Sequence, residues 1–383
     1  MSYLFETEEH TALRAQLGRF AGSAIAPNAQ AWEEAGEFPR ELYRTAAAAG
    51  ALGIGFPVEY GGSGGDITHQ IVASEALTIH GRSVGTAVGL GSLSIALPPI
   101  LLLGSEDQKR RYLPRVLSGE WVSALAITEP DGGSDVAALH TTARLVEDSY
   151  VVNGSKLYIT SGCRADLVVT AVRTDPDRSK RHQGLSLLLV EKTFPGYAPS
   201  RKLHKMGWSA SDTAELAFSD CRVPVENRLG EEGSAFFAIV NNFAAERLLL
   251  AAQCVAIAQL AYDESVAYAK LRSTFGKPLA RHQVIRHKLA DMATQLAAAR
   301  AFVGECAVRC QRGQVVMRQL AMCKNTATDM CSFVVDQAVQ IHGGLGYMRE
   351  CIVERLYRDA RLYPIGGGTR EIMNEIIAQA EGY

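Results

Sequence analysis

The stretch Tyr150-Val-Val-Asn-Gly-Ser-Lys-Leu-Tyr-Ile-Thr160 decides how this chain of 383 residues is divided. Its β-branched and aromatic residues favour strands, and Asn153-Gly154 is a typical turn between two of them. Two further β-favouring runs, Leu167 to Val172 and Leu185 to Val190, follow with turn signals at Ser161-Gly162 and Pro195-Gly196. We therefore predict an all-β domain over residues 120–226.

The chain on both sides of this β region has a helical pattern. Leu13, Leu17 and Phe20 recur at helical spacing before it, and long alanine- and leucine-rich segments follow Pro224. A chain of this length is expected to hold two or three domains. We predict an α+β multidomain protein with an N-terminal α-helical domain at 1–119, the β domain at 120–226 and a C-terminal helical domain at 227–383.

Composition excludes several classes of protein. Lys and Arg number 39 against 41 Asp and Glu, so no net field favours nucleic acid or an acidic membrane surface. G-x-G-x-x-G, Walker A and H-E-x-x-H patterns do not occur, which argues against Rossmann, P-loop and zincin enzymes. The eight cysteines form no Cys-x-x-Cys pair, and the N-terminus does not look like a signal peptide. We expect no metal and a reduced, cytoplasmic compartment.

One uncharged stretch, Ser83 to Ser105, is long enough to span a bilayer. It contains Gly85, Gly89, Gly91 and the Pro98-Pro99 pair, which would interrupt a spanning helix. We interpret it as buried helices of a large core and expect no membrane association, with a spanning helix as the alternative.

An isolated carboxylate stands out in the C-terminal region. From Gly233 to Tyr262 the only charged side chains are Glu246 and Arg247. Apolar surroundings disfavour the charged form of a carboxylate and raise its pKa, which suits a general base working near neutral pH. The alternative is a buried, paired structural Glu-Arg.

Three glycine-rich segments are candidate ligand loops: Ile127 to Asp135, Gln340 to Tyr347 and Ile365 to Glu371. Backbone without Cβ atoms can approach a flat ligand closely, and neighbouring polar residues can contact phosphate or ribose. Helix C-caps and tight turns are the alternative explanation of such clusters.

Together these segments resemble the acyl-CoA dehydrogenase family over almost the whole chain. The matching motifs are Thr128-Glu-Pro-x-x-Gly-Ser-Asp135, Gly154-Ser-Lys-x-Tyr-Ile-Thr160, Arg272-x-x-Phe-Gly-Lys-Pro-Leu279 and Gln340-x-x-Gly-Gly-x-Gly-Tyr347. The resemblance implies a helical N-terminal domain, a middle β-barrel and a C-terminal four-helix bundle. It also implies a homotetramer that binds FAD without covalent attachment.

The resemblance further implies the ligand contacts. Part of the FAD site is expected to come from a neighbouring subunit. The implied cofactor-binding residues are Leu125, Ile127, Thr128, Gly133, Ser134, Tyr158, Thr160, Arg272, Phe275, Gln283, Gln340, Gly343, Gly344, Thr369 and Glu371. Ser134, Phe243 and Arg247 are expected to contact the substrate.

The chain departs from the common family pattern at the catalytic position. Many members carry the catalytic Glu in a Tyr-Glu-Gly-Thr segment, where this chain has Gly367. The isovaleryl and long-chain branches place that Glu on the earlier helix, and the matching residue is Glu246. We expect Glu246 to take the α-proton and flavin N5 the β-hydride, with the backbone N–H of Gly367 pointing towards the thioester oxygen.

The expected reaction is the dehydrogenation of an acyl-CoA to a trans-2-enoyl-CoA in fatty-acid or branched-chain amino-acid catabolism. Electrons would pass to an electron-transfer flavoprotein. Ala244 and Ser209 replace the family's Asp and Arg, which keeps a carrier-protein thioester open as a substrate. An oxidase that uses O₂ and a non-catalytic flavin scaffold also remain open as functions. A branched or medium-length acyl group is the favoured substrate.

Overall fold

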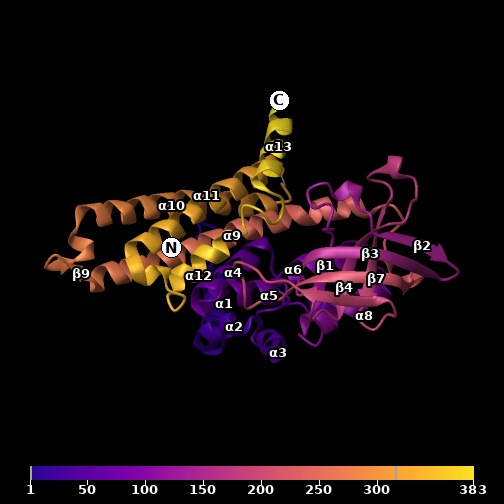
Figure 1. The fold of residues 1–383 in the computed structure, drawn as a ribbon, viewed down its shortest axis with the longest axis horizontal. Helices are drawn as coiled ribbons and strands as arrows, with labels where there is room; N and C mark the ends of the chain where they lie inside the picture. Colours follow the sequence, from indigo (N-terminus) through magenta and orange to yellow (C-terminus); the bar gives the residue numbers. More distant parts are fainter. Residues whose placement is uncertain (1, 315–316) are drawn as a thin grey trace.

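The computed structural model describes residues 2–314 and 317–383. Its N-terminal part is helical, as predicted, and most of these helices form the indigo and purple layer beneath the long C-terminal helices in Figure 1, while the last of them lies below the sheet. The helices are α1 (Glu8–Phe20), α2 (Ala29–Ala35), α3 (Glu41–Ala48), α4 (Ile67–Gly81), α5 (Val84–Gly91), α6 (Leu93–Ala96), α7 (Pro98–Leu103) and α8 (Glu106–Leu117).

The middle part is a mixed sheet in the order β6-β7-β3-β2-β4-β5-β8, with β1 beside β4. All pairs are antiparallel except those that β1 and β2 make with β4. The strands are β1 (Ser123–Ala126), β2 (Thr142–Val146), β3 (Ser149–Thr160), β4 (Leu167–Arg173), β5 (Leu185–Glu191), β6 (Tyr197–Lys202), β7 (Thr213–Pro224) and β8 (Arg228–Leu229).

The turn expected at Asn153-Gly154 is wrong. These residues lie inside β3, where the pairing with β7 shifts register between Val152 and Gly154. Gly154 has a φ of 143°, and a Cβ there would lie 2.8 Å from the Cα of Thr141. The chain reverses instead between β2 and β3, at Glu147-Asp148. The same glycine that suits a turn therefore serves a β-bulge.

The C-terminal part is a bundle of long helices. They are α9 (Ala235–Leu271), α10 (Gln283–Gln311) and α11 (Met317–His342), completed by α12 (Ile352–Ala360) and α13 (Arg370–Glu381). A short hairpin of β9 (Ser273–Thr274) and β10 (Lys277–Pro278) joins α9 to α10. The 37 residues of α9 correspond to about 55 Å, so this helix runs from the sheet to the hairpin at the opposite end (Figure 1).

Two segments, Val84–Leu103 and Ala235–Leu271, are long and apolar enough to cross a membrane by length and composition alone. More than half of each apolar window is buried inside the fold. The first is divided into α5, α6 and α7, and Leu93, Leu97 and Ile100 pack in the core beneath the sheet. Both segments thus pack as core helices.

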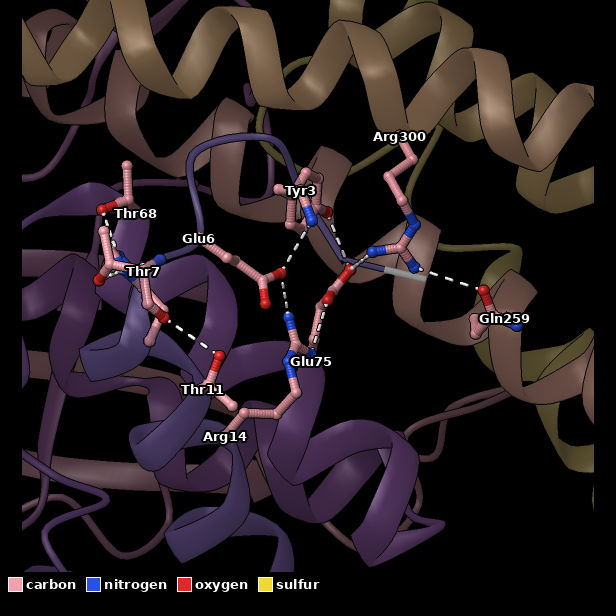
Figure 2. A network of polar contacts seen from close by, with 10 residues as sticks. Tyr3, Glu6, Thr7, Thr11, Arg14, Thr68, Glu75, Gln259 and Arg300 are labelled. Carbon is pink, nitrogen blue, oxygen red and sulfur yellow. Dashed lines mark hydrogen bonds and ion pairs between the residues drawn. The ribbon is translucent and has the colours of Figure 1, made fainter.

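A buried network fastens the N-terminal helices to the bundle (Figure 2). The fully buried carboxylate of Glu75 on α4 accepts hydrogen bonds from Tyr3 Oη at 2.8 Å, Arg14 Nη1 at 3.0 Å and Arg300 Nη1 at 2.9 Å. Removing one partner of such a buried pair costs about 3–5 kcal/mol. The network therefore fixes α4, which carries one wall of the site, against α10.

Candidate active site

A cavity of about 1390 Å³ lies where the three parts of the chain meet. Helices α4, α5, α6 and α9, the end of β1 with the segment after it, the end of β3 and the loop before α13 contribute to its wall. Twelve of the residues singled out in the sequence line it: Leu125, Ile127, Thr128, Gly133, Ser134, Tyr158, Thr160, Phe243, Glu246, Arg247, Gly367 and Thr369.

The end of β3 presents an aromatic ring to this cavity. Tyr158 has a φ of 62°, in the left-handed region that a bulky residue seldom adopts, and the residue is 66% exposed. The backbone N–H of Leu157 donates to the carbonyl of Thr128 at 2.8 Å, which joins this irregular strand end to the loop after β1. A strained, exposed ring over a cavity is a ready surface for a flat ligand.

A buried ion pair holds the same two segments together. Lys156 Nζ donates to Glu129 Oε1 at 2.8 Å and to the carbonyl of Ile127 at 3.0 Å. Glu129 also accepts the backbone N–H groups of His140 and Thr141. Burial lowers the pKa of Lys156 to about 8. Glu129 and Lys156, which belong to the family motifs at 128–135 and 154–160, therefore have a structural role that the sequence did not reveal.

Glu246 lies on the cavity side of α9. Its Oε2 atom is buried without a hydrogen-bond partner among the described residues. Burial raises the pKa of this carboxyl to about 7, against the lowering influence of Arg247 and Lys324. An unpartnered carboxylate with a near-neutral pKa is able to take up a proton from a substrate in the cavity.

Gly367 faces this carboxylate from the loop before α13. Its φ is +65°, and a Cβ built there would lie 3.7 Å from Glu246 Oε1 and 2.6 Å from Leu250 Cδ1. Gly368 follows with a φ of +96°. Both the positive φ and the contact with Leu250 favour glycine at position 367.

Two buried cations hold this glycine loop. Arg247 Nε donates to the carbonyl of Gly367 at 3.2 Å, and Lys324 Nζ on α11 donates to the carbonyl of Gly368. Burial lowers the pKa of both Arg247 and Lys324, that of Lys324 to about 8. The guanidinium of Arg247, which we expected at the substrate, is thus also tied to the loop.

The remaining predicted cofactor residues do not line the cavity. Phe275 is 97% exposed in the β9–β10 hairpin, with Arg272 and Gln283 beside it in the chain. The ring of His342 stacks on Tyr268 with centroids 4.3 Å apart, which places the end of α11 near the end of α9. The predicted residues away from the cavity are Arg272, Phe275, Gln283, Gln340, Gly343, Gly344 and Glu371.

The two residues that depart from the family pattern, Ala244 and Ser209, do not line the cavity. Ala244 is buried in the core of the bundle, and Ser209 follows the cavity residue Trp208 without lining the cavity itself. Leu90, Leu93 and Ile95 of the uncharged stretch line the wall, whereas Leu97 does not. The apolar part of the wall thus comes from both α5 and α6.

One group of possible metal ligands, His10, Asp66 and His69, occurs in the described part of the chain. The backbone N–H of Thr7 donates to His10 Nδ1, and that of Asp66 donates to His69 Nδ1. These side chains therefore cap the first turns of α1 and α4.

Two polar residues at the site were missed in the sequence. Lys324 is a lone lysine on the apolar face of α11, among Leu320, Ala327 and Cys331, and a charge on such a face was the available signal. Gln253 is a buried amide that lines the cavity from α9. Its position in a long apolar helix was a signal of the same kind.

Family models match nearly the whole chain. The acyl-CoA dehydrogenase N-terminal domain matches residues 7–120, the middle domain 124–221 and the C-terminal domain 236–382. An acyl-CoA dehydrogenase of Bacillus subtilis (strain 168) is 40% identical over 97% of this chain and 98% of its own. The mitochondrial long-chain specific acyl-CoA dehydrogenase of Sus scrofa is 37% identical over 97% of this chain and 86% of its own.

Comparison with solved structures gives the same result as the family models. One described as a probable acyl-CoA dehydrogenase from Mycobacterium abscessus is 48% identical with a TM-score of 0.96, covering 98% of this chain and 99% of that one. A structure described as the electron transferring flavoprotein of Acidaminococcus fermentans contains a chain that is 36% identical, with a TM-score of 0.95 and full coverage of both. The chain therefore belongs to the acyl-CoA dehydrogenase family of flavin-dependent oxidoreductases.

Proposed function

We propose that the protein uses FAD to convert an acyl-CoA thioester into a trans-2-enoyl-CoA, with Glu246 as the base. The observation that carries this proposal is the buried, unpartnered carboxylate of Glu246 beside the glycine loop at 367. A structural Glu-Arg pair is the weaker interpretation, because Arg247 donates its hydrogen bond to the Gly367 carbonyl.

Each residue at this end of the cavity has a task in the reaction. Glu246 removes the α-proton of the acyl group, for which its pKa of about 7 is suited. The Gly367 N–H donates to the thioester oxygen while negative charge develops there. Arg247 and Lys324 hold the next two peptide groups of the loop, and the apolar side chains of the wall exclude water. A bound flavin supplies the acceptor for the β-hydride.

Two separate groups of residues in the chain are suited to bind FAD. Tyr158, Thr160, Thr128 and Ser134 line the cavity, where the isoalloxazine would lie. Arg272 and its neighbours, proposed for the pyrophosphate and adenosine, lie at the far end of α9, about 40 Å along the helix from Glu246. One copy cannot bring both sets to one cofactor, which supports an oligomer in which a neighbouring copy completes each site, and we propose a homotetramer.

The proposed electron acceptor is an electron-transfer flavoprotein. Its support is the similarity to a chain in the Acidaminococcus fermentans structure described above. All eight cysteines are free, which fits the reducing cytoplasm that we propose as the location. The proposed pathway is the catabolism of fatty acids or branched-chain amino acids.

The experiment is anaerobic bleaching of the purified flavoprotein with acyl-CoAs of short, branched, medium and long chain. We expect one class to bleach the flavin and the reduced protein to reoxidise slowly in air until an electron-transfer flavoprotein is added. Fast reoxidation in air alone would identify an oxidase. Absence of bleaching with every CoA ester, but bleaching with a carrier-protein thioester, would replace the proposed substrate.

A further inference from the structure

Helix α9 presents one continuous stripe to the cavity. Phe243, Glu246, Leu250 and Gln253 line it at spacings of three and four residues, so their side chains share one face of the helix. The next position on this face, Ile257, is fully buried in the core. Gln253 is therefore the last residue of the stripe, about 10 Å along the axis from Glu246.

Gln253 differs from Asn242 and Gln259 of the same helix in having no side-chain partner among the described residues. Asn242 Nδ2 donates to the carbonyl of Ile95 at 2.8 Å, and Gln259 Nε2 donates to Asp263 at 3.0 Å. Gln253 is 8% exposed, and no described residue hydrogen-bonds its side chain. Its amide atoms are open to the cavity, so solvent or a bound molecule there supplies the hydrogen-bond partner that a largely buried amide requires.

The neighbouring wall is also polar. Gln70 and Ser74 of α4 line the same cavity, and α4 lies against α9, with Arg82 Nη1 paired to Glu264 Oε1 at 2.7 Å. Gln70 Nε2 is already committed to the carbonyl of Ile54 at 3.0 Å, which leaves its amide oxygen as an acceptor. Within the α9 stripe, by contrast, the residues on either side of Glu246 are the apolar Phe243 and Leu250.

We propose that Gln253 is a specificity-determining residue that recognises an oxygen on the acyl chain, so that the preferred substrates are hydroxyacyl or oxoacyl thioesters oxygenated remote from the α-carbon. This inference rests on the proposed function and narrows its substrate class. The amide donates to a ketone or hydroxyl oxygen and accepts from a hydroxyl hydrogen. The distance along α9 places that oxygen about 10 Å beyond the carbon that loses its proton.

The inference predicts a specific discrimination. A plain alkyl chain of the same length displaces solvent from Gln253 and leaves the amide unpaired. Sites that hydrogen-bond a substrate hydroxyl discriminate strongly against analogues that lack it. We expect kcat/KM to be at least tenfold higher for the oxygenated substrate of matching length.

The test compares octanoyl-, decanoyl- and dodecanoyl-CoA with their ω-hydroxy and (ω-1)-oxo counterparts, by anaerobic flavin reduction of the holoprotein. The variant Gln253→Leu is expected to lose the preference for oxygenated chains. Its kcat/KM for plain alkyl chains should rise at least tenfold over that of the wild type. Gln259→Leu makes the same change on the same helix away from the cavity and should retain the wild-type preference. Flavin content and thermal unfolding show whether each variant is folded.

Three outcomes distinguish the claims. Equal rates for plain and oxygenated chains in the wild type would overturn this inference and leave the proposed dehydrogenation intact. A preference that persists in folded Gln253→Leu would remove Gln253 from the recognition. Absence of flavin reduction with every thioester would overturn the proposed function and this inference with it.

Discussion

Glu246 on α9 and Gly367 before α13 face each other at one end of the cavity, so that a Cβ on Gly367 would lie 3.7 Å from Glu246 Oε1. The two positions thus flank one point in space, although one belongs to a long helix and the other to a loop. A carboxylate placed on either element can reach a substrate atom between them. This geometry would let one fold carry the proposed base at either place in the chain.

The first prediction moves the base from one element to the other. In Glu246→Gln/Gly367→Glu, the new side chain meets Leu250 Cδ1 at 2.6 Å from its Cβ and adopts an unfavourable φ of +65°. Adding Leu250→Ala removes the clash. We expect this triple variant to reduce flavin at least ten times faster than Glu246→Gln alone, measured by anaerobic bleaching. No recovery in a variant that still binds flavin and substrate would show that the two positions do not share a substrate atom.

The second prediction concerns pH. The raised pKa of Glu246, about 7, means that the carboxyl is largely protonated below that pH and unable to act as a base. We expect kcat/KM to rise with pH through a midpoint near 7 and then to level off. Stopped-flow flavin reduction across this range checks it. A rate that is independent of pH from 5 to 8, with chemistry limiting, would contradict the assignment.

The third prediction tests Lys324 as a positioning residue. Its ammonium bonds the Gly368 carbonyl and lowers the pKa of Glu246. Lys324→Met should therefore reduce kcat by about tenfold and shift the pH–rate midpoint upwards, whereas Lys324→Arg should keep the midpoint close to that of the wild type. Lys288→Met, which removes a lysine from α10, serves as the control. A loss of thermal stability without a shifted midpoint would limit Lys324 to a structural role.

The fourth prediction tests whether two copies build each flavin site. Tyr158→Ala disrupts the flavin-binding residues that line the cavity, and Arg272→Ala disrupts those at the far end of α9. Each variant alone should therefore purify with little flavin. Co-expressed chains that carry one change each form mixed oligomers in which some sites combine two intact sets. We expect flavin content and activity to return to a measurable fraction of the wild type. Flavin loss that co-expression does not repair would place both sets in one copy.

Much of the fold was visible in the sequence because its signals are local. Strand-favouring runs such as Leu167 to Val172 and helical spacing around Leu17 depend on neighbouring residues, and the three parts follow from them. Glu246 was visible for the same reason, as one of two charges in thirty residues. The turn predicted at Asn153-Gly154 was wrong because the backbone conformations that glycine permits suit a turn and a β-bulge alike.

The rest depends on contacts between distant segments. Lys324 meets the Gly368 carbonyl only when α11 packs beside the last loop, and Glu129 meets Lys156 across two segments of the sheet domain. The separation of Arg272 from Tyr158 follows from the length and straight course of α9, which motif order along the chain does not reveal.

The most direct test of the account is flavin reduction by Glu246→Gln. The amide keeps the shape of the side chain but cannot take the α-proton, so we expect the variant to retain its flavin and bind acyl-CoA while its reduction rate falls by about 10²–10⁴. Glu375→Gln, a change on α13 outside the cavity lining, should reduce its flavin at the wild-type rate. Flavin reduction by Glu246→Gln at the wild-type rate would contradict the central claim.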